Sequence, residues 1–172
     1  NKVDCSIIRG SLNSDTTINR LSKIAKEKNI SVLINNAALH CPHLPFEKIS
    51  QRQIQNILTT NLIVPIKLTK KIYPFFMEKK QGTIININSI SGLESQELRT
   101  IYCASKWGLR GFTATLRLEA KKHNIRIIEI YPSRIRTRPY FKEGMETTVV
   151  AEKILHFYED AYKCELILDG RR

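Results

Sequence analysis

Residues 82–106, GTIININSISGLESQELRTIYCASK, contain the unit that decides the fold. The run TIININ at 83–88 is rich in β-branched residues and follows Gly82, which predicts a buried strand. Apolar residues then recur at helical spacing from residue 100 to residue 122, which predicts a long helix. A strand followed by a long helix is typical of a parallel sheet, because parallel strands need a long crossover connection.

The same alternation continues on both sides of this unit. Short apolar runs bounded by turn residues predict further strands at 5–12, 31–34, 125–131 and 165–168. Helices separate these runs, so each crossover is expected to be right-handed and to cover the sheet. The chain is therefore predicted to be an α/β protein with a doubly wound, mostly parallel sheet in a single domain spanning 1–172.

The helices between the strands carry their own start and bend signals. Asp15 is expected to cap the first helix. Ser50 and Gln53 form a capping box at the start of a long helix, in which Pro65 predicts a bend. A last helix is predicted at 149–162.

Composition places the chain among ordinary globular proteins. Of its 172 residues, 42% are hydrophobic and 26% are charged, which excludes a disordered chain. No apolar run reaches the roughly 18 residues that a membrane span needs, so no membrane partner is expected. The four cysteines have no regular spacing, which excludes a disulfide framework and favours a cytoplasmic location.

The chain is strongly basic, with 28 Lys and Arg against 16 Asp and Glu and a net charge of +12. This charge attracts phosphates of any kind, including those of a nucleotide cofactor. The lysine pairs lie at the ends of predicted helices and do not form a stripe with interleaved aromatic residues. Solvated helix surfaces are therefore favoured over a nucleic-acid-binding surface.

Ligands of such sheets bind beyond the carboxyl ends of the strands, so the residues that follow each strand are candidates for a site. Tyr102 and Lys106 lie one helical turn apart on one face of the predicted helix. A lysine ammonium beside a phenol lowers its pKa and makes it a usable acid or base. Ser89, at the end of a neighbouring strand, could hold a carbonyl or alcohol oxygen there. By itself, however, Tyr-x-x-x-Lys is more often an amphipathic surface pair.

Five blocks together resemble the short-chain dehydrogenase/reductase family and cover most of the chain. They are LINNAA at 33–38, TTNL around Asn61, GTIININS ending at Ser89, YCASK at 102–106 followed by WGLRGF, and IRIIEIYPSRIRT at 125–137. They stand in the family's order, and Ser89 precedes Tyr102 by the customary thirteen positions. Each block is weak evidence, but the combination is specific. The resemblance implies a Rossmann-like fold.

The resemblance also implies hydride transfer between a nicotinamide cofactor, NAD or NADP, and a small carbonyl or alcohol substrate. Tyr102 would exchange the proton and Ser89 would orient the substrate oxygen. Lys106 would lower the pKa of the tyrosine and bind the nicotinamide ribose. Asn61 would hold a water of a proton relay. The hydride chemistry itself belongs to the cofactor.

Further cofactor contacts are implied at three places. The turn after the strand at 31–34 would lie near the adenosine, and the segment after the strand at 125–131 would lie near the nicotinamide carboxamide. Ser11 stands where the family often has an acidic residue near the adenine. The implied cofactor-binding residues are Ser11, Asn36, Ala37, Ala38, Tyr102, Lys106, Pro132, Ser133, Ile135 and Thr137.

The resemblance implies a homodimer or homotetramer, because the family helices that match 50–77 and 100–122 pack against their copies in another subunit. Apolar residues on the outer faces of these helices could equally be ordinary core. The segment 138–147, with Tyr140 and Phe141, corresponds to a short substrate lid. His40, Cys41 and His43 are interpreted as loop residues, because no fourth metal ligand accompanies them.

The sequence departs from the family pattern in three ways. Ala38 and Ser133 stand where the family usually has glycine. Gly10 is the only glycine before Gly82, so the family's first two strands and its glycine-rich phosphate-binding turn are missing. A complete domain of this class has about 250 residues, so about 70 to 80 upstream residues are expected in addition.

Two functions therefore stay open. The first is an NAD(P)-dependent oxidoreductase with Tyr102 as general acid or base. The alternative is a catalytically inactive remnant that acts as an oligomerisation or interaction module. The residues that choose between NADH and NADPH belong to the missing segment, and the net charge gives NADPH a small preference.

Overall fold

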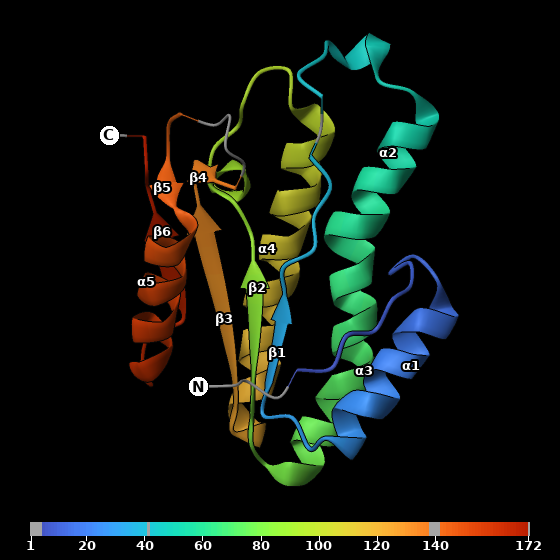
Figure 1. The fold of residues 1–172 in the computed structure, drawn as a ribbon, viewed down its shortest axis with the longest axis vertical. Helices are drawn as coiled ribbons and strands as arrows, with labels where there is room; N and C mark the ends of the chain where they lie inside the picture. Colours follow the sequence, from blue (N-terminus) through green and yellow to red (C-terminus); the bar gives the residue numbers. More distant parts are fainter. Residues whose placement is uncertain (1–4, 41, 138–141, 172) are drawn as a thin grey trace.

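The computed structural model describes residues 5–40, 42–137 and 142–171. Its centre is a parallel sheet of four strands in the order β1-β2-β3-β6 (Figure 1). The strands are β1 (Val32–Asn35), β2 (Gly82–Ile87), β3 (Ile125–Pro132) and β6 (Glu165–Leu168). The four corresponding sequence predictions are confirmed to within one residue at each end.

Helices cover both faces of this sheet, as the α/β prediction requires. They are α1 (Asp15–Glu27), α2 (Gln51–Leu58), α3 (Val64–Lys79), α4 (Thr100–Ala120) and α5 (Thr147–Glu159). On one face, Ile84 of β2 and Ile127 of β3 pack with Phe76 of α3. On the other face, Ile85 and its neighbours pack with Phe157 of α5. Successive residues of the buried strands therefore serve opposite cores, which explains why these strands are apolar throughout.

Gly82 shows why β2 begins where it does. A Cβ atom at this position would lie 2.3 Å from the ring of Phe76, so only glycine allows α3 to pack this closely on the start of the strand. Phe76 itself is fully buried. Packing thus requires Gly82, the glycine that marks the start of the strand in the sequence.

The long helix predicted from residue 50 is divided into two by a widened turn. The capping box of Ser50 and Gln53 is confirmed at the start of α2. A π-helical turn, η2 (Thr59–Ile63), then separates α2 from α3. Pro65 has no N–H to donate to the carbonyl of Asn61, four residues earlier, and this accounts for the disturbed hydrogen bonding. The expected bend is therefore a π turn that contains a predicted site residue.

Two sequence predictions near the start of the chain are wrong. Residues 5–12 form no strand, because no neighbouring strand in the described structure pairs with them. Asp15 is the first residue of α1 and not its cap; the cap position is Ser14, whose side chain makes no capping hydrogen bond.

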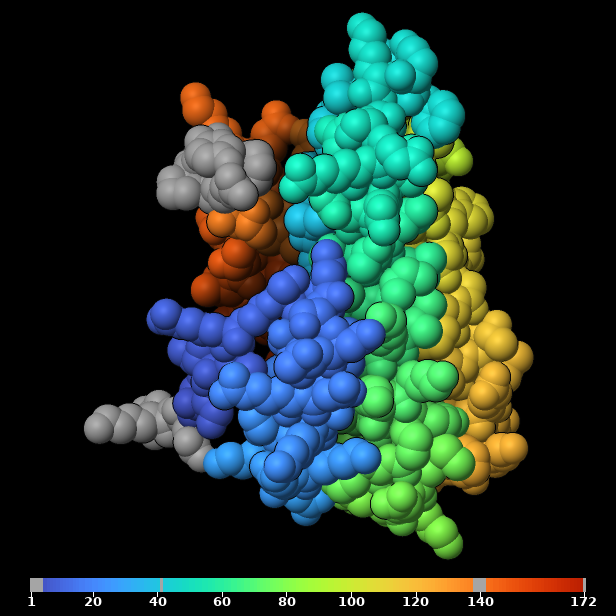
Figure 2. All heavy atoms as spheres, turned by 90° about the vertical axis from the view of Figure 1, so that its right-hand side faces the viewer, coloured from blue at the N-terminus to red at the C-terminus, as the bar shows by residue number. Residues whose placement is uncertain are grey.

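The open edge of β1 lies near α1. Among the described residues, β1 pairs only with β2, and Ile34 is 56% exposed. Helix α1 lies alongside α3 (Figure 2).

Sequence patterns did not predict a second, two-stranded parallel sheet. It pairs β4 (Ile135–Arg136) with β5 (Met145–Glu146) just beyond the end of β3. Gly144 precedes β5 with a φ of 113°, and a Cβ there would lie 2.7 Å from the carbonyl oxygen of Arg134. The glycine therefore allows the chain to return to this edge.

Among the described residues, none of the helices combines the length and the hydropathy that a membrane crossing requires.

Candidate active site

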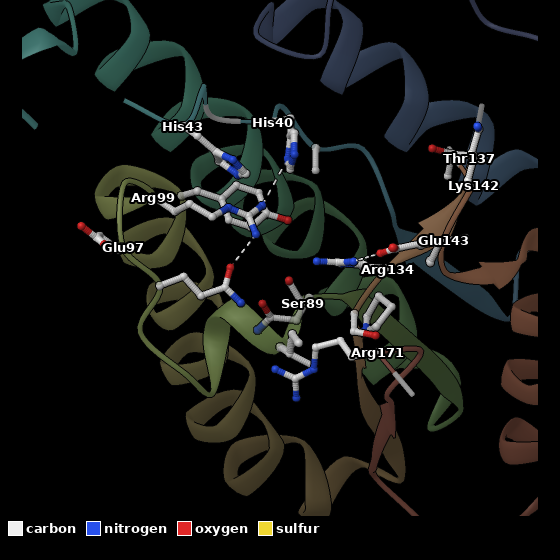
Figure 3. A pocket seen from close by; sticks show the side chains of 18 residues that line it. His40, His43, Ser89, Glu97, Arg99, Arg134, Thr137, Lys142, Glu143 and Arg171 are labelled. Atoms are coloured by element: carbon white, nitrogen blue, oxygen red, sulfur yellow. Dashed lines mark hydrogen bonds and ion pairs between the residues drawn. The ribbon is translucent and has the colours of Figure 1, made fainter. Parts of the chain in front are cut away.

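A cavity of about 1100 Å³ opens beyond the carboxyl ends of the strands, where a parallel sheet of this kind binds its ligands (Figure 3). Seven of the predicted site residues line it: Ala38, Ser89, Tyr102, Pro132, Ser133, Ile135 and Thr137. They come from the segments that follow β1 and β2, from the end of β3 and the β4 segment after it, and from the first turn of α4. The topology thus brings together residues that are far apart in the sequence.

Tyr102 and Ser89 form the centre of the predicted site. Tyr102 lies in the first turn of α4 and is 9% exposed. Burial raises the pKa of its phenol, while a hydrogen bond with the Ser89 side chain and the nearby Arg99 guanidinium lower it. The Ser89 hydroxyl also accepts a hydrogen bond from the Ser91 amide at 3.2 Å, which fixes it at the end of β2. The phenol and the hydroxyl therefore face the same cavity.

Lys106 lies behind Tyr102 and does not line the cavity wall. Its side chain is buried, and its Nζ atom donates to the carbonyl of Ile87 at 3.0 Å. The ammonium lies 5.8 Å from the centre of the Tyr102 ring. Burial lowers the pKa of Lys106 to about 8, and Glu129 partly opposes this shift. The lysine is therefore held behind the phenol by the end of β2. The predicted lowering of the Tyr102 pKa by Lys106 is not found, because burial raises that pKa and the groups that oppose it are Ser89 and Arg99.

Asn61 has a structural task that uses its whole amide group. Its Oδ1 accepts from the Leu39 amide at 2.7 Å, and its Nδ2 donates to the Leu39 carbonyl at 3.0 Å. The same Nδ2 also contacts the Ser105 hydroxyl at 3.2 Å. Asn61 thus ties the segment after β1 to α4 next to Lys106. Any relay through this residue has to use its main-chain carbonyl.

Besides Lys106, three predicted cofactor residues lie outside the main cavity. Asn36 and Ala37 line a smaller cavity of about 260 Å³ between β1, α1 and α3. Ser11 is exposed in the turn before α1, where its hydroxyl accepts from the Asn13 amide at 3.3 Å, and it lines neither cavity.

A buried polar cluster lies behind Lys106 and was not predicted. The Asn88 Nδ2 atom donates to Glu129 at 2.6 Å and to the main-chain carbonyl of Lys106 at 3.1 Å. The Tyr131 hydroxyl donates to the other carboxylate oxygen of Glu129 at 2.8 Å. Burial raises the pKa of Glu129, and these two hydrogen bonds lower it. A carboxylate in the middle of the apolar run IRIIEIYP was the signal in the sequence.

Charged side chains surround the outer part of the cavity. Arg134 pairs with Glu143, and Arg171 pairs with Glu94 at 2.8 Å. His40, His43, Gln96 and Arg99 form the wall next to Tyr102. Sequence reasoning missed these residues as site components. Of the predicted lid, Tyr140 and Phe141 lie outside the described residues, while Lys142 and Glu143 line the cavity.

A nicotinamide fits the donor set at this end of the sheet. Only one of the three ammonium donors of Lys106 has a partner in the described structure, the Ile87 carbonyl. The cavity floor beyond β3 is formed by Pro132, Ile135 and Thr137. A pyrophosphate group fits less well, because the described residues contain no glycine-rich turn; a Cβ at Gly10 would lie 2.6 Å from Thr17.

The fold and the site together define a Rossmann-like α/β domain with a serine, a tyrosine and a lysine at the carboxyl ends of its strands. The family model described as "short chain dehydrogenase" matches residues 2–145. The chain belongs to the short-chain dehydrogenase/reductase family.

Two curated relatives have similar sequences. An NADP-dependent 3-hydroxy acid dehydrogenase of Schizosaccharomyces pombe is 37% identical over 112 residues, which are 63% of this chain and 42% of the relative. An acetoacetyl-CoA reductase of Acinetobacter is 36% identical over 109 residues, which are 63% of this chain and 44% of the relative. The matched part thus spans less than half of each relative.

Solved structures agree with the fold. A 4-hydroxyisoleucine dehydrogenase complexed with NADH superposes with a TM-score of 0.82 at 26% identity, covering 95% of this chain and 78% of that one. A short-chain dehydrogenase from Streptomyces avermitilis superposes with a TM-score of 0.83 at 20% identity, covering 95% and 71%.

Proposed function

We propose that the protein is an NAD(P)-dependent oxidoreductase that acts on a small carbonyl or alcohol substrate within one domain spanning 1–172. The observation that carries this proposal is the Tyr102 phenol, which lines the same cavity as the Ser89 hydroxyl while the Lys106 side chain is buried behind it. The names of the relatives, which are dehydrogenases and reductases, support it.

In this proposal each residue has one task. The Ser89 hydroxyl donates to the substrate oxygen and holds it beside Tyr102. The Tyr102 phenol is protonated at neutral pH and gives its proton to the oxygen of a carbonyl that is being reduced. Burial raises its pKa, and the Ser89 hydroxyl and the Arg99 guanidinium act against this shift. A bound nicotinamide supplies or accepts the hydride.

Lys106 and Asn61 act from behind this pair. Lys106 offers its two remaining donors to the nicotinamide ribose. Asn61 fixes the segment after β1, and its carbonyl, to which Pro65 supplies no N–H, is the proposed holder of a relay water. Pro132, Ser133, Ile135 and Thr137 would contact the carboxamide, and Asn36, Ala37, Ala38 and Ser11 would lie toward the adenosine.

NADPH is the proposed cofactor, because the net charge is +12 and one relative is NADP-dependent. A cytoplasmic location is also proposed; Cys5, Cys103 and Cys164 are free thiols.

A homodimer or homotetramer is proposed as the working assembly. Helix α4 presents an exposed apolar stripe at helical spacing, formed by Ala104, Trp107, Gly111, Ala114 and Leu118. Leu118 is 78% exposed, and nothing lies within 4 Å of a Cβ built at Gly111. Such a stripe allows close approach of a second helix.

The alternative is an inactive remnant that keeps the fold and the oligomer interface. It is favoured by the poor fit of a pyrophosphate to the described residues. Isothermal titration calorimetry with NADPH and NADH separates the two. The enzyme is supported if either cofactor binds and if a screen of carbonyl substrates, followed by the absorbance of the reduced nicotinamide, finds turnover. Binding of neither supports the remnant.

A further inference from the structure

Arg99 is a cation in the cavity wall that no carboxylate neutralises. It precedes α4, and its guanidinium carbon lies 4.5 Å from the centre of the Tyr102 ring. Its NH1 donates to the Gln96 side-chain oxygen at 2.5 Å, and its NH2 lies 3.4 Å from His40 Nδ1. Its Nε is buried without a partner, and in the described structure Arg99 takes part in no ion pair. A buried donor without an acceptor is costly unless a ligand satisfies it.

The other arginines of the cavity differ from Arg99 in this respect. Arg134 has Glu143, and Arg171 has Glu94 and Asp169. Glu97 is close to Arg99 in the sequence, but Figure 3 shows its carboxylate pointing away from the guanidinium. The positive charge of Arg99 is therefore available to a ligand in the cavity.

The local structure holds Arg99 in this position. Leu98, the residue before it, has a φ of 60°, a left-handed conformation that is unfavourable for a non-glycine residue. The Leu98 carbonyl accepts from the Leu44 amide at 3.3 Å, which ties this turn to the loop after β1. Strain of this kind persists where surrounding contacts fix a side chain for function.

His40 completes the same wall. Its ring packs edge-on against Tyr102, with 5.6 Å between the ring centres. Burial, the Arg99 charge and His43 all lower the pKa of His40, so the imidazole is neutral at pH 7. Figure 3 shows His40, His43 and Arg99 on one side of the cavity and Arg134 and Thr137 on the other, with Ser89 between them. The Arg99 side is thus separate from the proposed nicotinamide contacts.

We propose that Arg99, assisted by His40, is an anion-binding subsite for the substrate, and that the substrate is a short oxo acid or its hydroxy acid. The carboxylate would meet the guanidinium while the carbonyl oxygen meets Ser89 and Tyr102. A planar guanidinium binds a carboxylate through two parallel hydrogen bonds, which also orients the carbonyl. The proposal rests on the proposed function. Reduction adds a hydride from the nicotinamide to the carbonyl carbon and the Tyr102 proton to its oxygen.

A matched pair of substrates tests the charge of the ligand. Acetoacetate and methyl acetoacetate share the same ketone, but only the first carries a carboxylate. With NADPH and the wild-type protein, kcat/KM is expected to be about 10- to 100-fold higher for acetoacetate. Arg99→Leu should remove this preference, so that kcat/KM for acetoacetate and for the ester become equal within about twofold. Arg110→Leu, which removes an arginine stacked on Trp107 of the same helix outside the cavity, should preserve it.

A second readout needs neither cofactor nor turnover. A bound carboxylate neutralises Arg99, so acetoacetate is expected to raise the pKa of His40. NMR titration of the His40 ring measures this pKa, and the spectrum of His43→Asn assigns the His40 signals. Methyl acetoacetate should have no such effect. This measurement on the wild-type protein decides the question even if Arg99→Leu fails to fold.

The outcomes distinguish the two proposals. A His40 response to acetoacetate without any turnover upholds the subsite and refutes the oxidoreductase. Turnover of both compounds at equal kcat/KM, with no His40 response, overturns the subsite and leaves the oxidoreductase standing. An equal loss of both activities in Arg99→Leu means that Arg99 acts on the Tyr102 phenol, which also overturns the subsite. Neither turnover nor response refutes both.

Discussion

Replacing Lys106 with methionine should stabilise the fold while it destroys the site. Lys106 is 2% exposed, and its pKa falls from 10.5 to about 8 because burial disfavours the charged form. One pKa unit corresponds to about 1.4 kcal/mol, so keeping the lysine protonated at pH 7 costs the native state roughly 3 kcal/mol. Methionine fills a similar volume and loses only the hydrogen bond to Ile87, worth about 1 kcal/mol. The expected net gain at pH 7 is about 1–3 kcal/mol.

The pH dependence makes this prediction specific. Between pH 8 and 10.5 the unfolded chain holds the Lys106 proton and the native protein does not, so wild-type stability rises with pH in this window. The advantage of Lys106→Met should therefore be complete below pH 8 and disappear near pH 10.5.

Urea unfolding at a series of pH values, followed by circular dichroism, measures the difference. Lys70→Met, which replaces an exposed lysine of α3, is the control and should change the free energy of unfolding by less than about 0.5 kcal/mol at every pH. If Lys106→Met is less stable than the wild type at pH 7, or if the difference does not depend on pH, the account of a desolvated lysine is refuted.

Three further perturbations follow from the same contacts. Glu129→Leu should lower the free energy of unfolding by about 2–5 kcal/mol, because it leaves Asn88 and Tyr131 with unpartnered buried donors. Glu129→Gln keeps an acceptor and should lower it clearly less. Equal losses of the two variants in urea unfolding would contradict this. Asn61→Ala should lower the free energy of unfolding by about 1–3 kcal/mol, because it leaves the amide and the carbonyl of Leu39 without their hydrogen-bond partner. An unchanged melting temperature would argue against it. Leu118→Arg should convert the proposed oligomer to monomers in size-exclusion chromatography with light scattering, and an unchanged mass would exclude the α4 stripe as the interface.

The strands of the sheet could be predicted because local patterns determine them. TIININ and IRIIEIYP are buried on both faces, so a continuous β-branched run is enough to identify each strand. The failure at residues 5–12 has the opposite cause. Apolar residues make that segment compatible with a strand, but a strand also needs a partner, and the described sheet ends at β1.

The centre of the site could be predicted because it follows strand ends and helix spacing. Ser89 ends β2, and Tyr102 lies four residues before Lys106 on α4. The wall of the cavity could not be predicted in this way. Arg99 and His40 are 59 positions apart, and they meet only because the loop after β1 and the turn before α4 lie over the same cavity. Their side chains have no periodic or motif signal.

The central claim is that the Tyr102 phenol transfers the proton, and one substitution tests it most directly. Tyr102→Phe removes the hydroxyl and keeps the ring, so with NADPH and a reducible ketone we expect kcat to fall by at least about 100-fold while calorimetry finds cofactor affinity unchanged within about twofold. Tyr162→Phe, at an exposed position after α5, should match the wild type. Wild-type turnover in Tyr102→Phe would contradict the account.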